Sequence, residues 1–175
     1  MPERNIDSEL PKLELTLKAE KTAEAVIEKL KTSSVKLALA ESCTAGLISG
    51  LLACIPGASG VLWGSFVCYT KEAKISMLGL ERDKIDAFGL VSKETACSMA
   101  EGALARSGAD IAVAVTGLAG PDGDGSTVPV GTVWVAATLR SGKIEVKEFR
   151  FSGARNAVRT CAAIAVFELL LNILT

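Results

Sequence analysis

Hydrophobic and polar positions follow two spacings along the chain, and these predict alternating helices and strands. Apolar residues at helical spacing predict helices over residues 13–32, 43–54, 71–78, 81–88, 92–106 and 155–173. Continuous apolar runs predict strands over residues 35–40, 61–69, 111–116, 131–139 and 143–151. Strands that alternate with helices are typical of an α/β domain. We expect residues 1–12 to form a flexible leader and residues 13–175 to form a single domain.

The connections between the predicted strands indicate which of them run parallel. Helix-length crossovers lead from the first strand to the second and from the second to the third, so these three should be parallel. The last two strands are joined by a tight turn at residues 140–142 and should be antiparallel to each other. Because parallel strands end at one edge of a sheet, Ser42, Tyr69 and Thr116 should lie close together there, within reach of Lys74.

The turn that joins the first predicted strand to the second predicted helix has the sequence Glu-Ser-Cys-Thr-Ala-Gly over residues 41–46. A strand-to-helix turn directs free backbone N–H groups and the positive end of the helix dipole outward. An anion or a developing oxyanion would be stabilised there, beside Ser42 and Thr44. The simpler interpretation is that Ser42 only caps the helix, as serine before an apolar run commonly does. The pattern alone leaves both interpretations open.

Composition and charge narrow the class of protein. The chain has 175 residues, of which 49% are hydrophobic, and a net charge of -1. This length is enough for a domain to bury its own core, and the near-neutral charge argues against nucleic acid as the main partner. The most apolar stretch, residues 160–175, is interrupted by Glu168 and Asn172, so we expect no membrane span. Five cysteines without a CxxC spacing indicate a reducing, cytoplasmic environment.

The chain contains no histidine. This excludes Ser-His-Asp and Cys-His catalysis, so acid–base chemistry must use carboxylates, lysine, tyrosine or water. It also excludes metal sites that contain histidine, and the cysteines are too scattered for a cysteine-only zinc site. Asp122, Asp124 and Ser126 faintly resemble a calcium loop, but Thr127 and Val133 stand where that loop requires glycine and glutamate. We expect neither a metal nor a cofactor.

Short motifs spread over most of the chain resemble one known family. They are Ala-Glu-Ser-Cys-Thr-x-Gly at residues 40–46, Ile-Pro-Gly at 55–57, Tyr-x-x-Glu-Ala-Lys at 69–74, Gly-x-Val-Ser at 89–92, Val-Thr-Gly-x-Ala-Gly-Pro at 115–121, Pro-Val-Gly-Thr-Val at 129–133, and Phe-Ser-Gly at 151–153 with Arg155 and Arg159. Over about residues 15–175 the chain resembles the C-terminal domain of the competence/damage-inducible CinA proteins. It departs from the family pattern at Ala45, Lys71, Ala154 and the pair Asp124-Gly125.

The resemblance implies a fold, an activity and a partner. The fold is α/β, a three-layer α/β/α sandwich with a mixed five-stranded sheet, and the assembly is commonly a homodimer or a higher homo-oligomer. Stand-alone members of the family are nicotinamide-nucleotide amidases, which hydrolyse nicotinamide mononucleotide to nicotinic acid mononucleotide and ammonia. The partner of this chain would then be a small pyridine nucleotide, and we expect neither nucleic acid nor a membrane as a partner.

The missing histidine and the resemblance together lead to a hypothesis for the chemistry. Ser42 would attack the carboxamide carbon, while Lys74, with Tyr69 relaying or orienting, would take the serine proton and pass it to ammonia. Backbone N–H groups at the start of the following helix would hold the oxyanion. The residues expected to bind the substrate are Thr44, Gly46, Thr116, Gly117, Gly120 and, at the phosphate, Arg159.

Two further residues bear on this hypothesis. Lys71 adds a like charge near Lys74 and could help to keep one of the two amines neutral. Cys43 is a conceivable nucleophile, but we expect it to turn inward as a small core residue.

Two other classes of function fit the same sequence. A non-catalytic nucleotide-binding module would use the same glycine-rich loops and would need no neutral lysine. An interaction protein in competence or DNA damage, which the family name evokes, would need no ligand at all. The chemical hypothesis differs from both because it requires Ser42 and Lys74 to act together.

Overall fold

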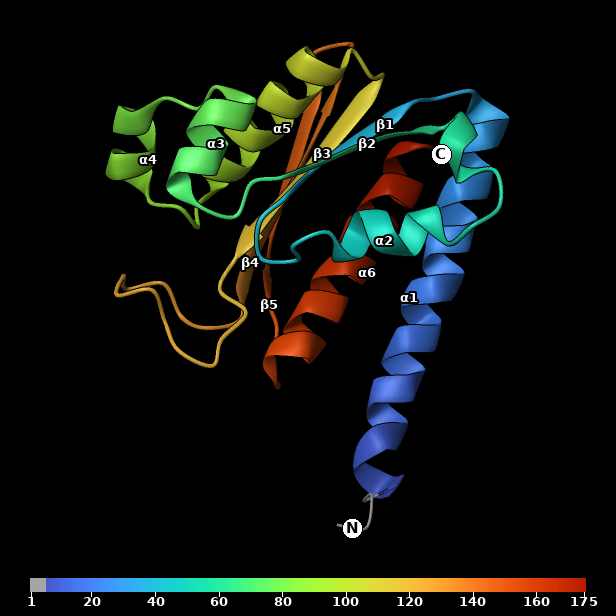
Figure 1. Ribbon diagram of the computed structural model, residues 1–175, viewed down its shortest axis with the longest axis horizontal. Helices are drawn as coiled ribbons and strands as arrows, with labels where there is room; N and C mark the ends of the chain where they lie inside the picture. The colour runs from blue at the N-terminus through green and yellow to red at the C-terminus, as the bar shows by residue number, and fades with distance from the viewer. Residues whose placement is uncertain (1–5) are drawn as a thin grey trace.

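The computed structural model describes residues 6–175, with side chains from Lys12 onward, and it has three layers (Figure 1). A five-stranded sheet lies between two layers of helices, as the resemblance implied. One face is covered by α1 (Ile6–Ser33), α2 (Leu47–Ala53) and α6 (Arg155–Ile173). The other face is covered by α3 (Lys71–Leu78), α4 (Arg82–Phe88) and α5 (Lys93–Ser107). A short 3-10 turn, η1 (Ala58–Gly60), leads into the second strand.

The sheet is mixed, with the strand order β2-β1-β3-β4-β5. Its strands are β1 (Leu37–Glu41), β2 (Leu62–Val67), β3 (Ile111–Gly117), β4 (Thr132–Leu139) and β5 (Ile144–Arg150). The predicted pairing is confirmed, because β1 is parallel to both β2 and β3, and β4 is antiparallel to β5. Glu41 pairs in register with Val67 of β2 and with Val115 of β3. The three parallel strands therefore end side by side, at one edge of the sheet.

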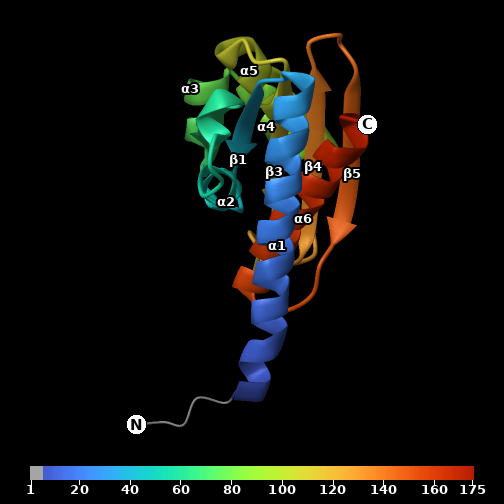
Figure 2. The same ribbon diagram turned by 90° about the vertical axis from the view of Figure 1, so that its right-hand side faces the viewer.

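The first helix is longer than the sequence pattern predicted. It begins at Ile6 instead of Leu13, so residues 6–12, which we expected in a flexible leader, are helical. Strong helix formers on both sides of Pro11 continue the helix although this proline removes one backbone hydrogen bond. The N-terminal part of α1 extends beyond the rest of the molecule (Figure 2). The remainder of the predicted leader, residues 1–5, lies outside the described residues.

The second helix begins later than predicted, at Leu47 instead of Cys43. The reason is local: Ala45 and Gly46 have φ angles of 50° and 88°, in the left-handed region, which a right-handed helix cannot include. Ser42 therefore does not cap α2. This difference changes which groups face the edge of the sheet.

Helix α6 is long and apolar enough to cross a membrane by length and composition, and it is the one such helix among the described residues. Its most apolar 18-residue window is half buried inside the molecule. The buried side chains, among them Val166, Phe167 and Leu170, belong to the core cluster between the sheet and α1. This packing is that of a core helix in a soluble fold.

Candidate active site

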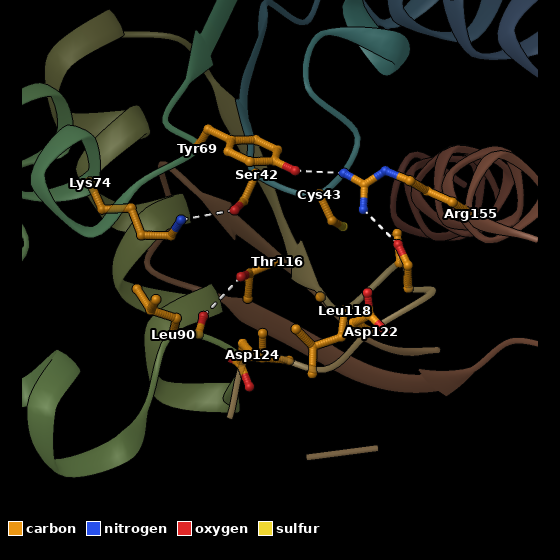
Figure 3. Close-up of a pocket in the computed structure, with 14 residues that line it drawn as sticks. Ser42, Cys43, Tyr69, Lys74, Leu90, Thr116, Leu118, Asp122, Asp124 and Arg155 are labelled. Atoms are coloured by element: carbon orange, nitrogen blue, oxygen red, sulfur yellow. Dashed lines mark hydrogen bonds between the residues drawn. The ribbon is translucent and has the colours of Figure 1, made fainter. Parts of the chain in front are cut away.

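A pocket of about 230 Å³ lies beyond the carboxyl ends of the parallel strands (Figure 3). It is lined by Ser42, Cys43, Tyr69, Lys74, Leu90, Val91, Thr116, Gly117, Leu118, Ala119, Gly120, Asp122, Asp124 and Arg155. The predicted convergence of Ser42, Tyr69 and Thr116 is therefore found in the structure, with Lys74 beside them. Open α/β sheets bind ligands at this position.

Alternation along β1 sends two consecutive side chains to opposite faces of the sheet. Leu39 packs in the core on the α2 side and Ala40 in the core on the α5 side. Continuing the alternation, Glu41 contacts the start of α2, and Ser42 contacts Lys74 of α3 on the other face. The end of β1 thus places the Glu41 carboxylate on one face of the sheet and the Ser42 hydroxyl group on the other.

The hydroxyl group of Ser42 is paired with the amine of Lys74. Lys74 Nζ lies 2.8 Å from Ser42 Oγ (Figure 3). It also donates a hydrogen bond of 2.9 Å to the carbonyl of Cys68. The lysine side chain is 1% exposed, and no carboxylate pairs with it in the described part of the chain. Burial therefore lowers the pKa of Lys74 from its ordinary value of 10.5. A buried amine of this kind can act as a base toward a neighbouring hydroxyl group.

Helix α3 fixes the position of Lys74. The Thr70 side chain caps this helix by accepting a hydrogen bond from the N–H of Ala73. Lys71, one turn before Lys74, forms an ion pair with Asp86 of α4 instead of approaching the pocket. The hypothesis that Lys71 keeps its neighbour neutral is not needed, because burial is the main cause of the lowered pKa of Lys74.

Cys43 follows the serine but is built as a core residue. Its side chain is 5% exposed and belongs to the hydrophobic cluster on the α2 side, as expected from the sequence. Burial raises the pKa of its thiol to about 11. The side chain is therefore a thiol, not a thiolate, near neutral pH, and it is a poor candidate for the nucleophile.

Tyr69 and Arg155 meet at the opposite side of the pocket. Arg155 Nη2 donates a 2.6 Å hydrogen bond to the Tyr69 hydroxyl, and Arg155 Nη1 donates one of 2.8 Å to the Gly120 carbonyl (Figure 3). No hydrogen bond joins Tyr69 to Ser42 or to Lys74, so the structure gives Tyr69 no direct relay. Arg155 was part of a recognised motif, but the sequence offered no reason to prefer it to Arg159 as the cation of the site.

The residues predicted to bind substrate divide into two groups. Thr116, Gly117 and Gly120 line the pocket, and the Thr116 hydroxyl donates to the Leu90 carbonyl at 2.8 Å. Thr44, Gly46 and Arg159 do not line it. Thr44 is buried, whereas Gly46 and Arg159, the latter on α6, are partly exposed outside the pocket.

The contacts of the second group show a structural role. The Thr44 hydroxyl and the Gly46 N–H both donate to Glu41 Oε2 at 2.9 Å, and Arg159 Nη2 donates to the Thr44 carbonyl at 2.7 Å. The N–H groups of Ile48 and Ser49 also donate to Glu41. The helix start that we expected to hold the oxyanion is therefore occupied by a carboxylate of the chain itself.

Two acidic side chains that sequence reasoning did not assign also line the pocket. Asp122 and Asp124 lie on the glycine-rich loop, and Asp124 accepts hydrogen bonds from the backbone and hydroxyl of Ser126, which lowers its pKa. The pocket thus carries both signs of charge, from these carboxylates and from Arg155. Within the described residues, no group of three or more histidine, cysteine or acidic side chains could hold a metal ion.

The fold and the pocket together define an open α/β protein with its site at the carboxyl ends of parallel strands. The family model of the CinA C-terminal domain matches residues 19–174. The chain therefore belongs to the CinA C-terminal domain family, as its motifs indicated.

Individual relatives agree with this placement. A CinA-like protein of Thermotoga neapolitana is 42% identical over 149 residues, which are 85% of this chain and 36% of that protein. The chain thus spans about a third of the length of the curated relatives it matches. The crystal structure of competence/damage inducible protein CihA from Agrobacterium tumefaciens is 40% identical, with a TM-score of 0.86, over 89% of this chain and 95% of that one. A CinA superfamily protein from Klebsiella pneumoniae is 31% identical, with a TM-score of 0.86, over 89% and 97%.

Proposed function

We propose that this chain is an amidase that hydrolyses nicotinamide mononucleotide to nicotinic acid mononucleotide and ammonia. The observation that carries the proposal is the 2.8 Å contact between Ser42 Oγ and the buried amine of Lys74, which has no carboxylate partner in the described residues. A neutral amine at this distance can take the proton of the attacking hydroxyl group. The substrate is the one that the family resemblance implies.

The reaction would proceed through an ester on the serine. Ser42 Oγ attacks the carboxamide carbon while Lys74 takes its proton. The resulting ammonium group of Lys74 then protonates the amide nitrogen, which leaves as ammonia when the C–N bond breaks. Lys74, neutral again, then takes a proton from water as the water oxygen attacks the ester, and returns that proton to Ser42 Oγ. The carbonyl of Cys68, which accepts the second hydrogen bond of the amine, keeps Nζ directed at Ser42.

The oxyanion formed in both steps needs hydrogen-bond donors beside Ser42. The Ser42 N–H is already bound to the Val115 carbonyl, and the Ala45 N–H to the Ser42 carbonyl. The N–H groups of Cys43 and Thr44 donate to no backbone oxygen among the described residues. Of the two residues, Cys43 lines the pocket next to the nucleophile, so its N–H is the donor that we assign to the oxyanion.

The charges and the size of the pocket fit a mononucleotide. Arg155 supplies a cation for a phosphate, and Asp122 and Asp124 supply negative charge for the cationic pyridinium ring. The volume of about 230 Å³ lies just below the range of roughly 300–1,000 Å³ that is usual for ligand pockets. Such a volume favours one nucleotide over a dinucleotide.

The test is ammonia release from nicotinamide mononucleotide by the purified chain without added metal. Ser42→Ala should lower the rate by about 10³-fold or more, because the covalent route is removed. Ser76→Ala, on the exposed face of α3 near Lys74, is the matched control and should leave the rate unchanged. A Ser42→Ala rate close to that of the wild type would contradict the proposal. Binding of the nucleotide by the wild type without ammonia release would instead support a nucleotide-binding module.

A further inference from the structure

Glu41 is a buried carboxylate surrounded by donors. Its side chain is 0% exposed and lies beside the pocket without lining it. It accepts five hydrogen bonds of 2.9 to 3.1 Å, from the Thr44 hydroxyl, the N–H groups of Gly46, Ile48 and Ser49, and the Ser65 hydroxyl. Both carboxylate oxygens act only as acceptors here, and no lysine or arginine pairs with them in the described residues.

These hydrogen bonds determine the path of the chain after Ser42. Glu41 binds the polar groups of the turn and of the first turn of α2, so the positive end of that helix is directed at the carboxylate and away from the pocket. On the other side of the same turn, Arg159 donates to the Thr44 carbonyl and Val115 accepts from the Ser42 N–H. The turn is therefore held at both of its ends.

We propose that Glu41 is a positioning residue for the nucleophile and for the oxyanion donor, the N–H of Cys43. It acts through the turn: by binding the Thr44 hydroxyl and the Gly46 N–H, it sets the orientation of the Cys43 N–H and of the Ser42 side chain. It does not contact the substrate. The role in the amide reaction rests on the proposed function, but the role in orienting Ser42 does not.

The first variant that tests this is Glu41→Gln, which keeps the shape of the side chain but places an amide NH₂ group opposite backbone and hydroxyl donors. We expect kcat for ammonia release to fall by about 10²-fold, the usual cost of misplacing reacting groups by about 1 Å, while KM changes less than about threefold. Far-UV circular dichroism and thermal unfolding establish that the variant is folded at the assay temperature. A folded Glu41→Gln variant with a kcat within about threefold of the wild type would overturn the proposal.

A second pair of variants keeps the proposal testable if Glu41→Gln does not fold. Thr44→Val and Ser65→Ala each remove one hydroxyl donor from Glu41, the first within the turn and the second on β2. Positioning through the turn predicts a clear fall in kcat for Thr44→Val and little change for Ser65→Ala. Equal effects of the two variants would show that Glu41 only stabilises the fold, and would overturn the proposal.

A covalent probe separates this inference from the amidase assignment. A fluorophosphonate reacts with an activated serine and leaves an oxyanion-like oxygen, so mass spectrometry of the protein gives the rate at which Ser42 is labelled without any nucleotide. Slower labelling in folded Glu41→Gln supports the inference even if the wild type releases no ammonia from nicotinamide mononucleotide. Ammonia release by the wild type together with unchanged labelling in the variant would overturn the inference and leave the amidase assignment standing.

Discussion

The two walls of the pocket are built in opposite ways. The turn wall, residues 42–46, is held by the buried Glu41 on one side and by Arg159 on the other, and Ser42 and Thr44 are buried within it. The loop wall, residues 117–126, is exposed over its second half. The contacts of this half are local, between Asp124 and Ser126. In the first half, Arg155 donates a hydrogen bond to the Gly120 carbonyl.

This difference suits the turn wall to holding the reacting atoms and the loop wall to binding the rest of a ligand. Reacting atoms lose rate steeply when they are misplaced, so they belong on a wall whose backbone is fixed by buried hydrogen bonds. Contacts with the non-reacting part of a ligand tolerate small movements, and an exposed loop can make them. We therefore expect changes near the turn wall to act on kcat and changes near the loop wall to act on KM.

Removal of the amine beside the turn wall should have the largest effect. Lys74→Met keeps the length and the burial of the side chain but removes the base, so we expect ammonia release to fall by about 10³-fold. Lys71→Met is the matched control on the same helix, because Lys71 pairs with Asp86 away from the pocket, and its rate should stay within about threefold of the wild type. Similar losses in the two variants, measured at saturating substrate, would break the proposed assignment of the base.

The pH dependence of the rate should follow the protonation of Lys74. Only the neutral amine can take a proton from Ser42, so kcat/KM should fall about tenfold per pH unit below the pKa of Lys74 and level off above it. Because burial lowers this pKa, the midpoint should lie below 10.5, and Lys71→Met should leave it unchanged. A midpoint at 10.5 or above would contradict the assignment.

The same protonation has a defined sign for stability. The folded state favours the neutral amine, so the contribution of Lys74 to stability is fully present above pH 10.5, the unfolded pKa, and is lost as pH falls through the folded pKa. The difference between the wild type and Lys74→Met in urea unfolding should therefore shift in favour of Met as the pH is lowered over this window.

Arg155, beside the loop wall, should affect binding more than chemistry. Arg155→Ala removes a charged donor for the phosphate, and we expect KM for nicotinamide mononucleotide to rise about 10- to 100-fold with a smaller change in kcat. Nicotinamide riboside lacks the phosphate and should show little difference between the two proteins. An equal loss with the riboside would place the effect of Arg155 in its hydrogen bonds to Tyr69 and Gly120 instead.

The smallest effect concerns the backbone of the turn wall. Ala45 adopts a φ of 50°, which costs a residue with a side chain about 1–2 kcal/mol, whereas glycine adopts it freely. Part of this gain is lost to the greater freedom of glycine in the unfolded chain, so Ala45→Gly should raise stability by about 0.5 kcal/mol and leave kcat unchanged. Thermal unfolding measures this as a rise in Tm of about 1–2 °C.

Gly46→Ala provides the opposite change at the next position. Gly46 has a φ of 88°, and an added Cβ would meet Val67 at 3.8 Å, an ordinary contact, so any loss would come from the backbone. We expect a loss of about 1–2 kcal/mol. A fall in Tm for Ala45→Gly as large as that for Gly46→Ala would contradict the strain at Ala45.

Much of the fold followed from the spacing of apolar residues. The bounds of α3 and α6 were predicted to the residue, and the parallel pairing of β1, β2 and β3 followed from the helical crossovers. The meeting of Ser42, Tyr69 and Thr116 followed from that pairing. These features depend on local pattern and on connection length, both of which are present in a single sequence.

What the sequence could not indicate depends on contacts between distant segments. The hydrogen bonds that Glu41 accepts depend on a backbone turn at Ala45 and Gly46, whose φ angles are not visible in the residue types. Arg155 and Arg159 lie one turn apart on the same helix, and only the packed structure separates the pocket residue from the one that holds the turn. The helical start of α1 was missed because Pro11 looked like a boundary.

Helix α6 joins the two walls, because Arg155 reaches the Gly120 carbonyl and Arg159 reaches the Thr44 carbonyl. Four residues along an α-helix correspond to a rise of about 6 Å. Because helix geometry fixes this interval, it also fixes the distance between the two carbonyl groups that the arginines bind, one in each wall of the pocket. A shift of α6 along its axis would therefore move both walls together. The width of the pocket thus depends on a helix that does not separate the walls but lies behind them, with its opposite face packed against α1.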